Sequence, residues 1–294
     1  ILDCLAWGAP GWIGDGKFYS QDMADYVVKF LQGAKRGHDL DITYTGIWNE
    51  TPHDTAWIKT LRRTLDSAGL RKVEIVAADN FDGDGWKIVD DMKADPALRA
   101  AVARVGVHYR ESKSPSSARD LGCPLWSSED GPWRGDWEGA MKLARTINRN
   151  YVTGKFTKTQ IWSPVTSYYD SLPLPGSGVM RANEPWSGHY EVQPAVWAVA
   201  HTTQFARPGW RYLDPACVMI DGGSVVALVS PEGNDFSIVI ETMDAKSPQK
   251  LGFHLNGLSG KDLHVWMTSE KKWFERCTMI QPTEGAFAIT VDSA

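Results

Sequence analysis

The sequence predicts an α/β fold in which a (β/α)8 barrel is followed by a small antiparallel β-sandwich. Two observations predict this fold. Up to about residue 207, short apolar runs alternate with helical patterns, which is typical of a parallel sheet covered by helices. Beyond that point the chain has strand-like runs around glycine-rich turns and no helical stripe. We therefore place a barrel domain at residues 1–207 and a β-sandwich domain at residues 208–294.

The predicted barrel strands are short apolar runs that contain β-branched or aromatic residues. Six such runs occur before residue 207: Leu2–Trp7, Ile42–Trp48, Val73–Ala78, Val102–Tyr109, Pro124–Ser127 and Thr159–Pro164. A closed barrel of this kind needs eight strands. The six runs therefore predict a barrel that is incomplete.

Helical patterns separate these runs. Apolar residues at i, i+3, i+4 and i+7 lie on one face of a helix, and we assign these stripes to the core. The first stripe consists of Met23, Tyr26, Val27, Phe30, Leu31 and Ala34. The second, with Asp54 as N-cap and Gly69 as the stop, consists of Ile58, Leu61, Leu65 and Ala68. The third, closed by Gly154, consists of Met141, Ala144, Ile147 and Tyr151.

The last part of the chain is predicted to be an antiparallel β unit. Its strand-like stretches are CVMIDGGSVVALVSPEGNDFSIVIETM (217–243), KLGFHL (250–255), DLHVWMTS (262–269) and AFAITV (286–291). Glycine-containing turns between such runs are typical of hairpins. We expect these hairpins to form the small sandwich.

Two glutamates stand at the ends of predicted strands. Glu50 closes the run ITYTGIWNE (42–50), and Glu129 lies in CPLWSSED (123–130). In a (β/α)8 barrel the carboxyl ends of the strands form the catalytic face. Two carboxylates facing each other there can cleave a glycosidic bond, because one protonates the leaving oxygen and the other attacks the anomeric carbon. A single carboxylate after a strand is more often a helix N-cap or a solvated loop residue.

The neighbours of these glutamates favour sugar chemistry. The amide of Asn49 can hydrogen-bond a sugar hydroxyl beside the anomeric carbon. The chain has 14 tryptophans, and a tryptophan ring can stack on the apolar C–H face of a sugar. Those at or near predicted strand ends are Trp7, Trp48, Trp126, Trp162 and Trp186. We expect a few of them to contact substrate and the rest to be core residues.

Four stretches of the chain closely resemble a known family. They are GAKRGHDLDITYTGIWNE (33–50), LWSSED (125–130), EPWSGHY (184–190) and HTTQFARPGWRYL (201–213). All are similar to the galactocerebrosidases (galactosylceramidases) of glycoside hydrolase family 59. The resemblance extends from about Leu5 to about Met243, which is most of the chain.

The resemblance implies roles for individual residues. Glu50 is expected to be the acid/base and Glu129 the nucleophile of a retaining, double-displacement mechanism. Asn49 and Trp7 are expected to contact substrate, and Trp162 corresponds to a tryptophan that lies under the sugar. The fold that the resemblance implies is a TIM barrel followed by a β-sandwich.

The chain also departs from the family. Set against it, Ile1 falls at the third barrel strand, so we expect the first two strand–helix units to be missing. No residues remain after Ala294 for the lectin-like domain that the family normally adds. The family's galactose-binding arginine has no counterpart, and the basic residue nearest to its position is Lys250. Because a lysine cannot reproduce the fixed fork of donors of an arginine, the choice between galactose and another sugar stays open.

Three functions follow as alternatives. The first is a retaining glycoside hydrolase that removes terminal β-galactose from galactosylceramide or a similar β-galactoside. The second is a retaining β-glycosidase of the same clan with another sugar, such as a glucosylceramidase-like enzyme. The third is an inactive, truncated chain that binds sugar. Glu50, Glu129 and Asn49 favour the two enzymes, whereas the missing strands favour the third alternative.

Composition and spacing exclude other partners. With a net charge of −5 and no basic tract, the chain is not expected to bind nucleic acid. No run approaches the ~20 apolar residues of a membrane span. No group of His, Cys or acidic residues has metal-ligand spacing, so we expect no metal and no cofactor. The expected partner is a β-galactoside or glycosphingolipid. An activator protein, a lipid surface and a lysosomal, secreted or periplasmic location are left open.

Histidines and cysteines are less informative. His108 ends the fourth predicted strand region, where it either has a structural role or holds a catalytic carboxylate. Cys4 and Cys123 lie on predicted buried strands and are expected to be free thiols. Cys217 and Cys277 share the β unit, and a disulfide between them stays open.

Overall fold

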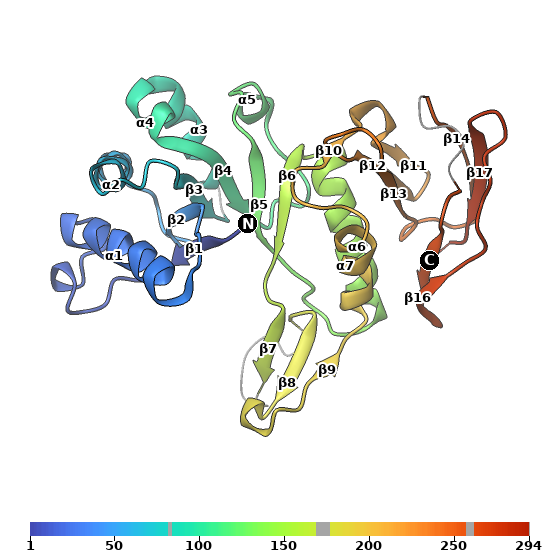
Figure 1. Cartoon of the computed structure of the whole chain (residues 1–294), viewed down its shortest axis with the longest axis horizontal. Coiled ribbons are helices and arrows are strands. Elements are labelled where there is room, and N and C mark those ends of the chain that lie inside the picture. The colour runs from blue at the N-terminus through green and yellow to red at the C-terminus, as the bar shows by residue number, and fades with distance from the viewer. Residues whose placement is uncertain (82–83, 169–176, 257–261, 294) are drawn as a thin grey trace. The chain divides into compact units, whose positions relative to one another are not determined.

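The computed structural model describes residues 1–81, 84–168, 177–256 and 262–293. Most of its helices and strands are labelled in Figure 1. By the contacts between its residues, the chain divides into two compact units. Unit 1 comprises Ile1–Asp130 and Lys155–Gln160, and unit 2 comprises Gly131–Gly154 and Ile161–Ala294. The domain boundary expected after residue 207 stays a prediction.

Unit 1 is built on a six-stranded sheet in which strands that follow one another in sequence are neighbours in space. Its strands are β1 (Asp3–Ala6), β2 (Tyr44–Trp48), β3 (Glu74–Asn80), β4 (Val102–His108), β5 (Leu125–Asp130) and β6 (Phe156–Ile161). Each pairing from β1 to β5 is parallel. All six predicted strands are confirmed, with ends that differ from the prediction by at most three residues.

Side chains from the two edge strands of this sheet meet on its concave face. The ammonium of Lys158 on β6 donates to the carboxylate of Asp3 on β1, with 2.6 Å between Nζ and Oδ2. Because neighbouring strands lie ~4.8 Å apart, the edges of a flat six-stranded sheet would be about 24 Å apart. The contact therefore requires a sheet that curls as part of a barrel does.

Helices pack against this sheet and bury its apolar side chains. They are α1 (Gln21–His38), α2 (Thr55–Ser67), α3 (Asp84–Ala94), α4 (Pro96–Ala101) and α5 (Ser116–Arg119). In the core, Met23, Ile58 and Leu61 of the helices are fully buried together with Ile47 and Ile75 of the strands. The first two predicted helical stripes are therefore core faces, except at Phe30, which was assigned to the core but is 49% exposed.

The helix ends follow from the residues found there. Asp54 caps α2 by accepting a hydrogen bond from the Trp57 N–H at 2.7 Å, as predicted. The helix ends just before Gly69, which has a φ of 76°. Helices α3 and α4 were not predicted. Asp95 and Pro96 separate them, with Pro96 in the first turn of α4, and this break hides the helical period in the sequence.

In its described residues, unit 2 has two α-helices, α6 (Trp137–Val152) and α7 (Ala195–Thr203), and several small sheets. The largest sheet consists of β10 (Arg211–Tyr212), β11 (Val218–Ile220), β12 (Gly223–Val229) and β13 (Phe236–Glu241). The other sheets are formed by β14 (Gln249–His254) with β17 (Ala286–Val291), by β15 (Trp266–Ser269) with β16 (Lys272–Arg276), and by β7 (Val165–Tyr168), β8 (Met180–Asn183) and β9 (Glu191–Val192). The antiparallel pairing predicted after residue 207 is confirmed. Its assembly into one sandwich stays a prediction.

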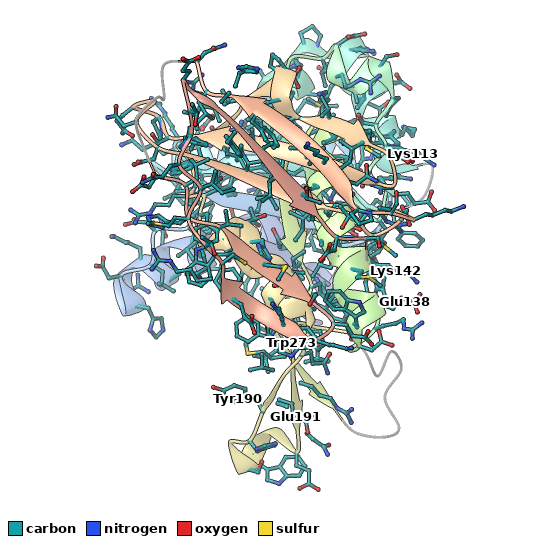
Figure 2. All side chains as sticks on the ribbon, turned by 90° about the vertical axis from the view of Figure 1, so that its right-hand side faces the viewer. Lys113, Glu138, Lys142, Tyr190, Glu191 and Trp273 are labelled. Carbon is teal, nitrogen blue, oxygen red and sulfur yellow. The ribbon has the colours of Figure 1, made fainter. Side chains whose placement is uncertain are left out.

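Helix α6, the third predicted helix, packs against the largest sheet of unit 2. The buried amide of Asn148 donates to the main-chain oxygens of Ser224 and Val239, at 3.3 and 3.1 Å. A solvent-exposed part of the same helix carries the ion pair between Glu138 and Lys142, at 2.7 Å, and Figure 2 labels both residues. The helix is therefore amphipathic, with polar side-chain bonds that attach it to the sheet.

Neither a disulfide nor a membrane span is found in the described part of the chain. Cys4, Cys123, Cys217 and Cys277 are all free thiols. The disulfide that the sequence left open between Cys217 and Cys277 is therefore not formed. Among the helices in the described ranges, none combines the length and the apolar character that crossing a membrane requires.

Candidate active site

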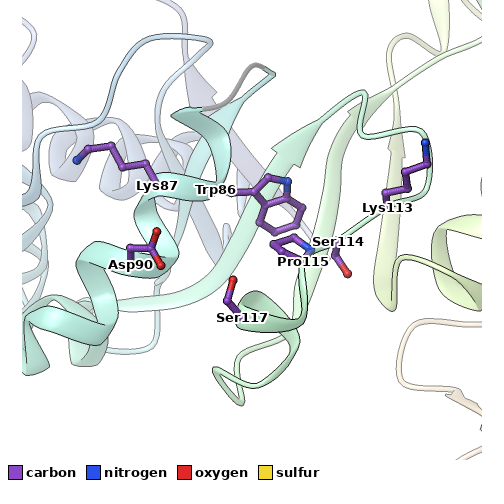
Figure 3. A pocket seen from close by; sticks show the side chains of 7 residues that line it. All are labelled: Trp86, Lys87, Asp90, Lys113, Ser114, Pro115 and Ser117. Atoms are coloured by element: carbon purple, nitrogen blue, oxygen red, sulfur yellow. The ribbon is translucent and has the colours of Figure 1, made fainter.

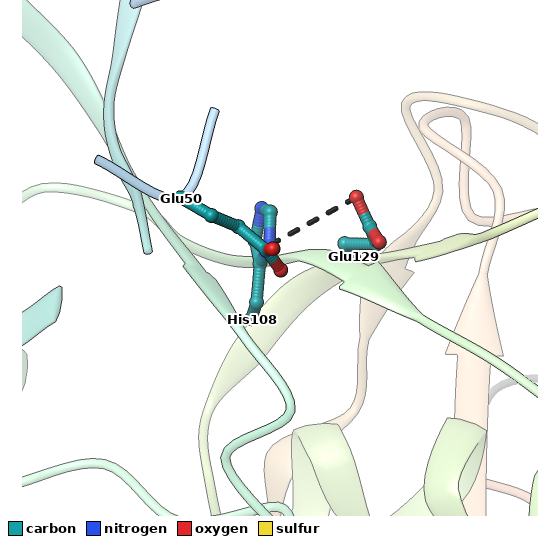
Figure 4. Close-up of side chains that lie close together, drawn as sticks. All are labelled: Glu50, His108 and Glu129. Carbon is teal, nitrogen blue, oxygen red and sulfur yellow. Dashed lines mark hydrogen bonds and ion pairs between the residues drawn. The ribbon is translucent and has the colours of Figure 1, made fainter. Parts of the chain in front are cut away.

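Three side chains meet at the carboxyl ends of strands in unit 1. Glu50 follows β2 by two residues, His108 is the last residue of β4, and Glu129 is the penultimate residue of β5. One carboxylate oxygen of each glutamate and a ring nitrogen of His108 all lie within 4.8 Å of one another. Figure 4 shows this arrangement. The fold thus brings together the two glutamates that the sequence singled out.

Main-chain hydrogen bonds fix these residues on the sheet. The Glu50 N–H donates to the carbonyl of Asp79 at the end of β3, at 2.8 Å, and the Asn49 N–H donates to the end of β1, at 3.0 Å. The Tyr109 N–H donates to the carbonyl of Glu129, at 3.2 Å. Glu50 has a φ of 50°, a left-handed conformation that glutamate rarely adopts. Such backbone is often found at functional residues, so it agrees with a functional role for Glu50.

Glu129 is the more buried of the two carboxylates. Its side chain is 9% exposed, against 31% for Glu50. Burial raises the pKa of Glu129, and the charge of Glu50 acts in the same direction. The hydroxyl of Tyr109 donates a hydrogen bond to the Glu129 carboxylate and favours its ionised form. Burial and this carboxylate raise the pKa of Tyr109, so the tyrosine keeps its proton and remains a donor.

His108 is fully buried, and its imidazole lies beside both carboxylates. Its Nδ1 is 3.1 Å from Oε1 of Glu50 and 3.9 Å from Oε2 of Glu129. Burial lowers the pKa of His108, although the bond to Glu50 opposes this shift. A neutral imidazole has one N–H and one lone pair. Nδ1 therefore either donates to an ionised Glu50 or accepts from a protonated one. The structure thus places this histidine against a carboxylate, the second of its two expected roles.

Asn49 and Trp7 lie at the same edge of the sheet. Asn49 directly precedes Glu50, and its buried Oδ1 has no hydrogen-bond partner among the described residues. A buried polar atom without a partner costs free energy, which a hydroxyl of a bound sugar would recover. Trp7 follows β1 and is 60% exposed. Both residues are open to contact with a ligand, and their binding role stays a prediction.

Two other strand-end tryptophans have structural contacts in unit 1. Trp48 stacks on Phe18, with 4.6 Å between ring centres, and its indole N–H donates to the main-chain oxygen of Trp7. Trp126 is buried, and the ammonium of Lys158 lies 4.2 Å from the centre of its ring. These two rings belong to the core, whereas the other three strand-end tryptophans are exposed.

The remaining tryptophans of interest belong to unit 2. Trp162 follows β6 and is 36% exposed, and Trp186 is 70% exposed. The main-chain oxygen of Trp162 passes close to Gly131, where an added Cβ would lie 2.9 Å away. The place of Trp162 under a bound sugar stays a prediction.

Two carboxylates and an imidazole are also a donor set that divalent cations accept. In this site the Tyr109–Glu129 and His108–Glu50 hydrogen bonds already engage these groups. Their closeness is therefore explained by hydrogen bonding alone. The expectation that the protein uses no metal stays a prediction.

A separate groove lies on unit 1, between α3 and the segment that precedes α5 (Figure 3). Its volume is about 730 Å³, and Trp86, Lys87, Lys113 and Pro115 contribute to its lining. None of the three side chains of the candidate site lines it. The groove and the candidate site are therefore distinct features of unit 1.

The fold and the candidate site together define a class of protein. A curled parallel sheet with carboxylates at the carboxyl ends of its strands is the architecture of barrel-type glycoside hydrolases. Among solved structures, the chain is similar to a glycoside hydrolase family 30 subfamily 8 xylanase from Clostridium acetobutylicum. The TM-score is 0.77 at 16% sequence identity, over all of this chain and 77% of the xylanase chain. This likeness shows the fold of the class.

Sequence comparison narrows the class to one family. Residues 1–204 match the model of glycosyl hydrolase family 59. The chain is 39% identical to a galactocerebrosidase of Salmo salar, over 98% of this chain and 46% of that protein. It is 42% identical to a galactocerebrosidase of Homo sapiens, over 92% of this chain and 42% of that protein. The chain therefore belongs to glycosyl hydrolase family 59, and it spans less than half the length of these two relatives.

Two polar residues of the site were not singled out from the sequence. Tyr109 contacts Glu129 only because β4 and β5 pair in the register that sets His108 beside Glu129. Asp79 follows the apolar run of β3 and reads as the first residue of a loop, yet it is buried. A carboxylate directly after an apolar strand was the signal that identified Glu50, and the same signal was available for Asp79.

Proposed function

We propose that this chain carries the catalytic centre of a retaining glycoside hydrolase that removes terminal β-galactose from galactosylceramide or a similar β-galactoside. The observation that carries the proposal is the short distance between Glu50 and Glu129. One carboxylate oxygen of Glu50 and one of Glu129 lie within 4.8 Å of each other. Retaining enzymes have carboxyl groups ~5–5.5 Å apart, whereas inverting enzymes need ~6.5–9.5 Å to hold a water between them. The short separation supports retention.

In the first step, Glu129 acts as the nucleophile. One of its oxygens attacks the anomeric carbon, the bond from that carbon to the leaving oxygen breaks, and a covalent glycosyl-enzyme forms. The Tyr109 hydroxyl supports this role because it keeps the buried carboxylate ionised before attack. Glu50 gives its proton to the leaving oxygen, so the aglycone departs as a neutral alcohol.

In the second step, Glu50 acts as the base. It takes a proton from a water that attacks the anomeric carbon, and the ester bond to Glu129 breaks. The side chain of Glu50 is the more exposed of the two carboxyl groups, which suits a residue that must meet both an aglycone and a water. Two inversions at one carbon give net retention.

The sugar and the aglycone are assigned from different observations. Asn49 is proposed to bind the hydroxyl next to the anomeric carbon, and Trp7 and Trp162 to contact the sugar through their rings. The names of the relatives, galactocerebrosidases, support galactose and a glycosphingolipid aglycone. The absence of an arginine at the position near Lys250 keeps a second candidate, a β-glycosidase of the same clan with another sugar.

The stereochemistry of the product tests the proposal. The whole natural protein is incubated with a nitrophenyl β-galactoside in an NMR tube, and the first galactose released is observed before it mutarotates. We expect the β-anomer first. Release of the α-anomer first would contradict retention. Hydrolysis of the matching β-glucoside but not of the β-galactoside would favour the second candidate. No hydrolysis of either would favour an inactive, sugar-binding chain.

A further inference from the structure

A buried aspartate lies next to the histidine of the proposed site. Asp79 is near the end of β3, and only 2% of its surface is exposed. Its Oδ1 lies 4.0 Å from Nε2 of His108, while Nδ1 of the same ring lies 3.1 Å from Oε1 of Glu50. The imidazole therefore stands between two carboxyl groups, one in the interior and one at the open end of the site.

Two glycines make the space that this aspartate occupies. A Cβ added to Gly46 on β2 would lie 2.7 Å from Oδ2 of Asp79, and one added to Gly106 on β4 would lie 2.7 Å from Oδ1. Asp79 also has a φ of 53°, and its carbonyl accepts the hydrogen bond from the Glu50 N–H. A carboxyl group is costly to bury, so a place shaped for one, in contact with the proposed acid/base, points to a function.

In the described part of the chain, Asp79 and His108 each have one buried polar atom without a partner, and in Asp79 this atom is Oδ2 and not Oδ1, the oxygen that faces the histidine. Among the described residues, neither Nε2 of His108 nor Oδ2 of Asp79 has a hydrogen-bond partner, although both atoms are buried. The separation of 4.0 Å between Nε2 and Oδ1 is about 1 Å longer than a hydrogen bond. Catalytic hydrogen bonds are often long without substrate and shorten when it binds. A small rotation of the Asp79 side chain would close this one.

We propose that Asp79 and Glu50 share one exchangeable proton through the imidazole of His108, which makes Asp79 a positioning residue for the acid/base. The inference rests on the proposed function of Glu50. In one arrangement, a protonated Glu50 donates to Nδ1, and Nε2–H donates to an ionised Asp79. In the other, a protonated Asp79 donates to Nε2, and Nδ1–H donates to an ionised Glu50. Both arrangements hold the same protons and the same charge, and His108 stays neutral in each.

The groups around Glu50 and His108 favour this arrangement. Glu129, from β5, lies 3.9 Å from Nδ1, and its negative charge disfavours a second one on Glu50. Tyr109, from the end of β4, keeps its proton and donates its hydrogen bond to Glu129, so it does not compete for the histidine. Burial, and to a smaller extent the charge of Arg110, lowers the pKa of His108 and disfavours an imidazolium. These groups therefore favour a neutral imidazole of His108 that passes a proton between Asp79 and Glu50.

The groups around Asp79 make its proton available near neutral pH. Burial raises the pKa of Asp79 to about 7. Asp3, from β1, and Lys158, from β6, are the other charges that act on it, but they pair with each other at 2.6 Å. Below about pH 7 Asp79 is therefore protonated and can supply its proton to Glu50 through the ring when substrate binding raises the proton affinity of Glu50.

The tautomer of His108 in the wild-type protein tests the proposal without any substitution in the site. The ring nitrogens are observed by ¹⁵N NMR between about pH 5 and 9, and their signals are assigned by their loss in His108→Gln. We expect a neutral ring with the proton on Nδ1 in part of the molecules and on Nε2 in the rest, in a ratio that does not change with pH as long as the shared proton is bound, because the two arrangements hold the same number of protons. A single tautomer over the whole range, or formation of an imidazolium, would overturn the proposal. This result does not depend on glycosidase activity.

The matched kinetic test compares Asp79→Asn with Glu74→Gln, which removes a carboxylate from the other end of the same strand, β3, where it pairs with Arg104 at 2.9 Å and does not contact the histidine. An amide cannot become negative, so the proton affinity of Glu50 should fall in Asp79→Asn. We expect the basic limb of kcat/KM on an alkyl galactoside to move to lower pH by about one unit, a loss of about tenfold above that pH. The Asp79→Asn variant should cleave an aryl galactoside with a good leaving group as well as the wild type does, and Glu74→Gln should leave the kcat/KM of both substrates unchanged.

An equal loss on both substrates, or the same shift in Glu74→Gln, would make Asp79 merely structural and overturn the proposal. Failure of the proposed function would look different. Glu50→Gln would then leave hydrolysis of the alkyl galactoside unchanged, whatever the tautomer of His108.

Discussion

The two ends of the concave face of the unit 1 sheet differ in how their charged side chains are paired. At the amino end, opposite charges form ion pairs: Asp3 pairs with Lys158 at 2.6 Å, and Arg104 pairs with Glu74 at 2.9 Å. At the carboxyl end, carboxyl groups crowd around a neutral histidine, and no lysine or arginine among the described residues forms an ion pair with Glu50 or Glu129 in the structure.

This difference separates a stabilising region from a reactive one. Opposite charges at the amino end tie the edge strands together and satisfy each other. Like charges at the carboxyl end raise the free energy of the folded state, and together with burial the charge of Glu50 raises the pKa of Glu129. Residues of the first region should therefore affect mainly stability when replaced, and residues of the second mainly activity.

The largest expected effect is that of Glu129→Ala. Without a nucleophile no covalent intermediate forms, so kcat/KM should fall by at least ~10⁴-fold on every β-galactoside, whatever its leaving group. The variant should be at least as stable as the wild type, because a buried carboxylate has been removed. Steady-state kinetics and thermal unfolding measure the two effects. Activity within about tenfold of the wild type would remove Glu129 from the mechanism.

Glu50→Ala should show a smaller loss that depends on the leaving group. General acid catalysis contributes ~10²–10⁴-fold, and only a poor leaving group needs it. We expect a loss of this size on an alkyl galactoside and a much smaller one on a dinitrophenyl galactoside. Added azide should accelerate the variant, because it can attack the glycosyl-enzyme without a base. Equal losses on both substrates would exclude Glu50 as the acid.

Asn49→Ala tests the carboxyl end at a residue that bears no charge. The loss of one preorganised donor to the sugar hydroxyl should lower kcat/KM by on the order of 10²-fold, with little change in the leaving-group dependence. A substrate that lacks this hydroxyl, a 2-deoxygalactoside, should be cleaved equally by variant and wild type. If the variant loses less than about threefold on the normal substrate, Asn49 is only a structural residue.

Lys158→Met tests the opposite end of the sheet and should have the smallest effect on activity. It leaves Asp3 without its partner while preserving apolar contact with Trp126, so we expect a loss of ~1–2 kcal/mol in the free energy of unfolding and less than about threefold in kcat/KM. Lys142→Met on α6, which breaks an exposed pair, should cost less than about 0.5 kcal/mol. If kcat/KM falls by much more than threefold in Lys158→Met while the free energy of unfolding stays unchanged, the two ends of the sheet do not differ in the way proposed.

The sequence identifies the framework of the site because the framework depends on local patterns. The apolar run that ends at Trp48 places Glu50 at a strand end, and the capping aspartate at Asp54 starts the next helix. The parallel alternation then puts Glu50 and Glu129 on one edge of the sheet. No long-range information beyond the alternation is needed for this step.

The remaining part of the site depends on register and packing, which the sequence does not display. The contact of Tyr109 with Glu129 requires the pairing of β4 with β5. The burial of Asp79 requires glycines on two other strands, β2 and β4. Trp48 is the opposite case. Its position at a strand end beside Glu50 suggests a contact with substrate, but its ring packs on Phe18. Position along the chain predicts the edge on which a side chain lies, but not its contacts.

The most direct test of the account is to trap the nucleophile. The whole natural protein is incubated with a 2-deoxy-2-fluoro-galactosyl fluoride, which forms the glycosyl-enzyme quickly and hydrolyses slowly, and the labelled peptide is sequenced by mass spectrometry. The account predicts one sugar per chain, bound to Glu129 in the peptide LWSSED. It also predicts that labelling persists in Glu50→Ala, because a fluoride leaving group needs no acid. A label on Glu50 or on another residue, or inactivation without a covalent label, would contradict it.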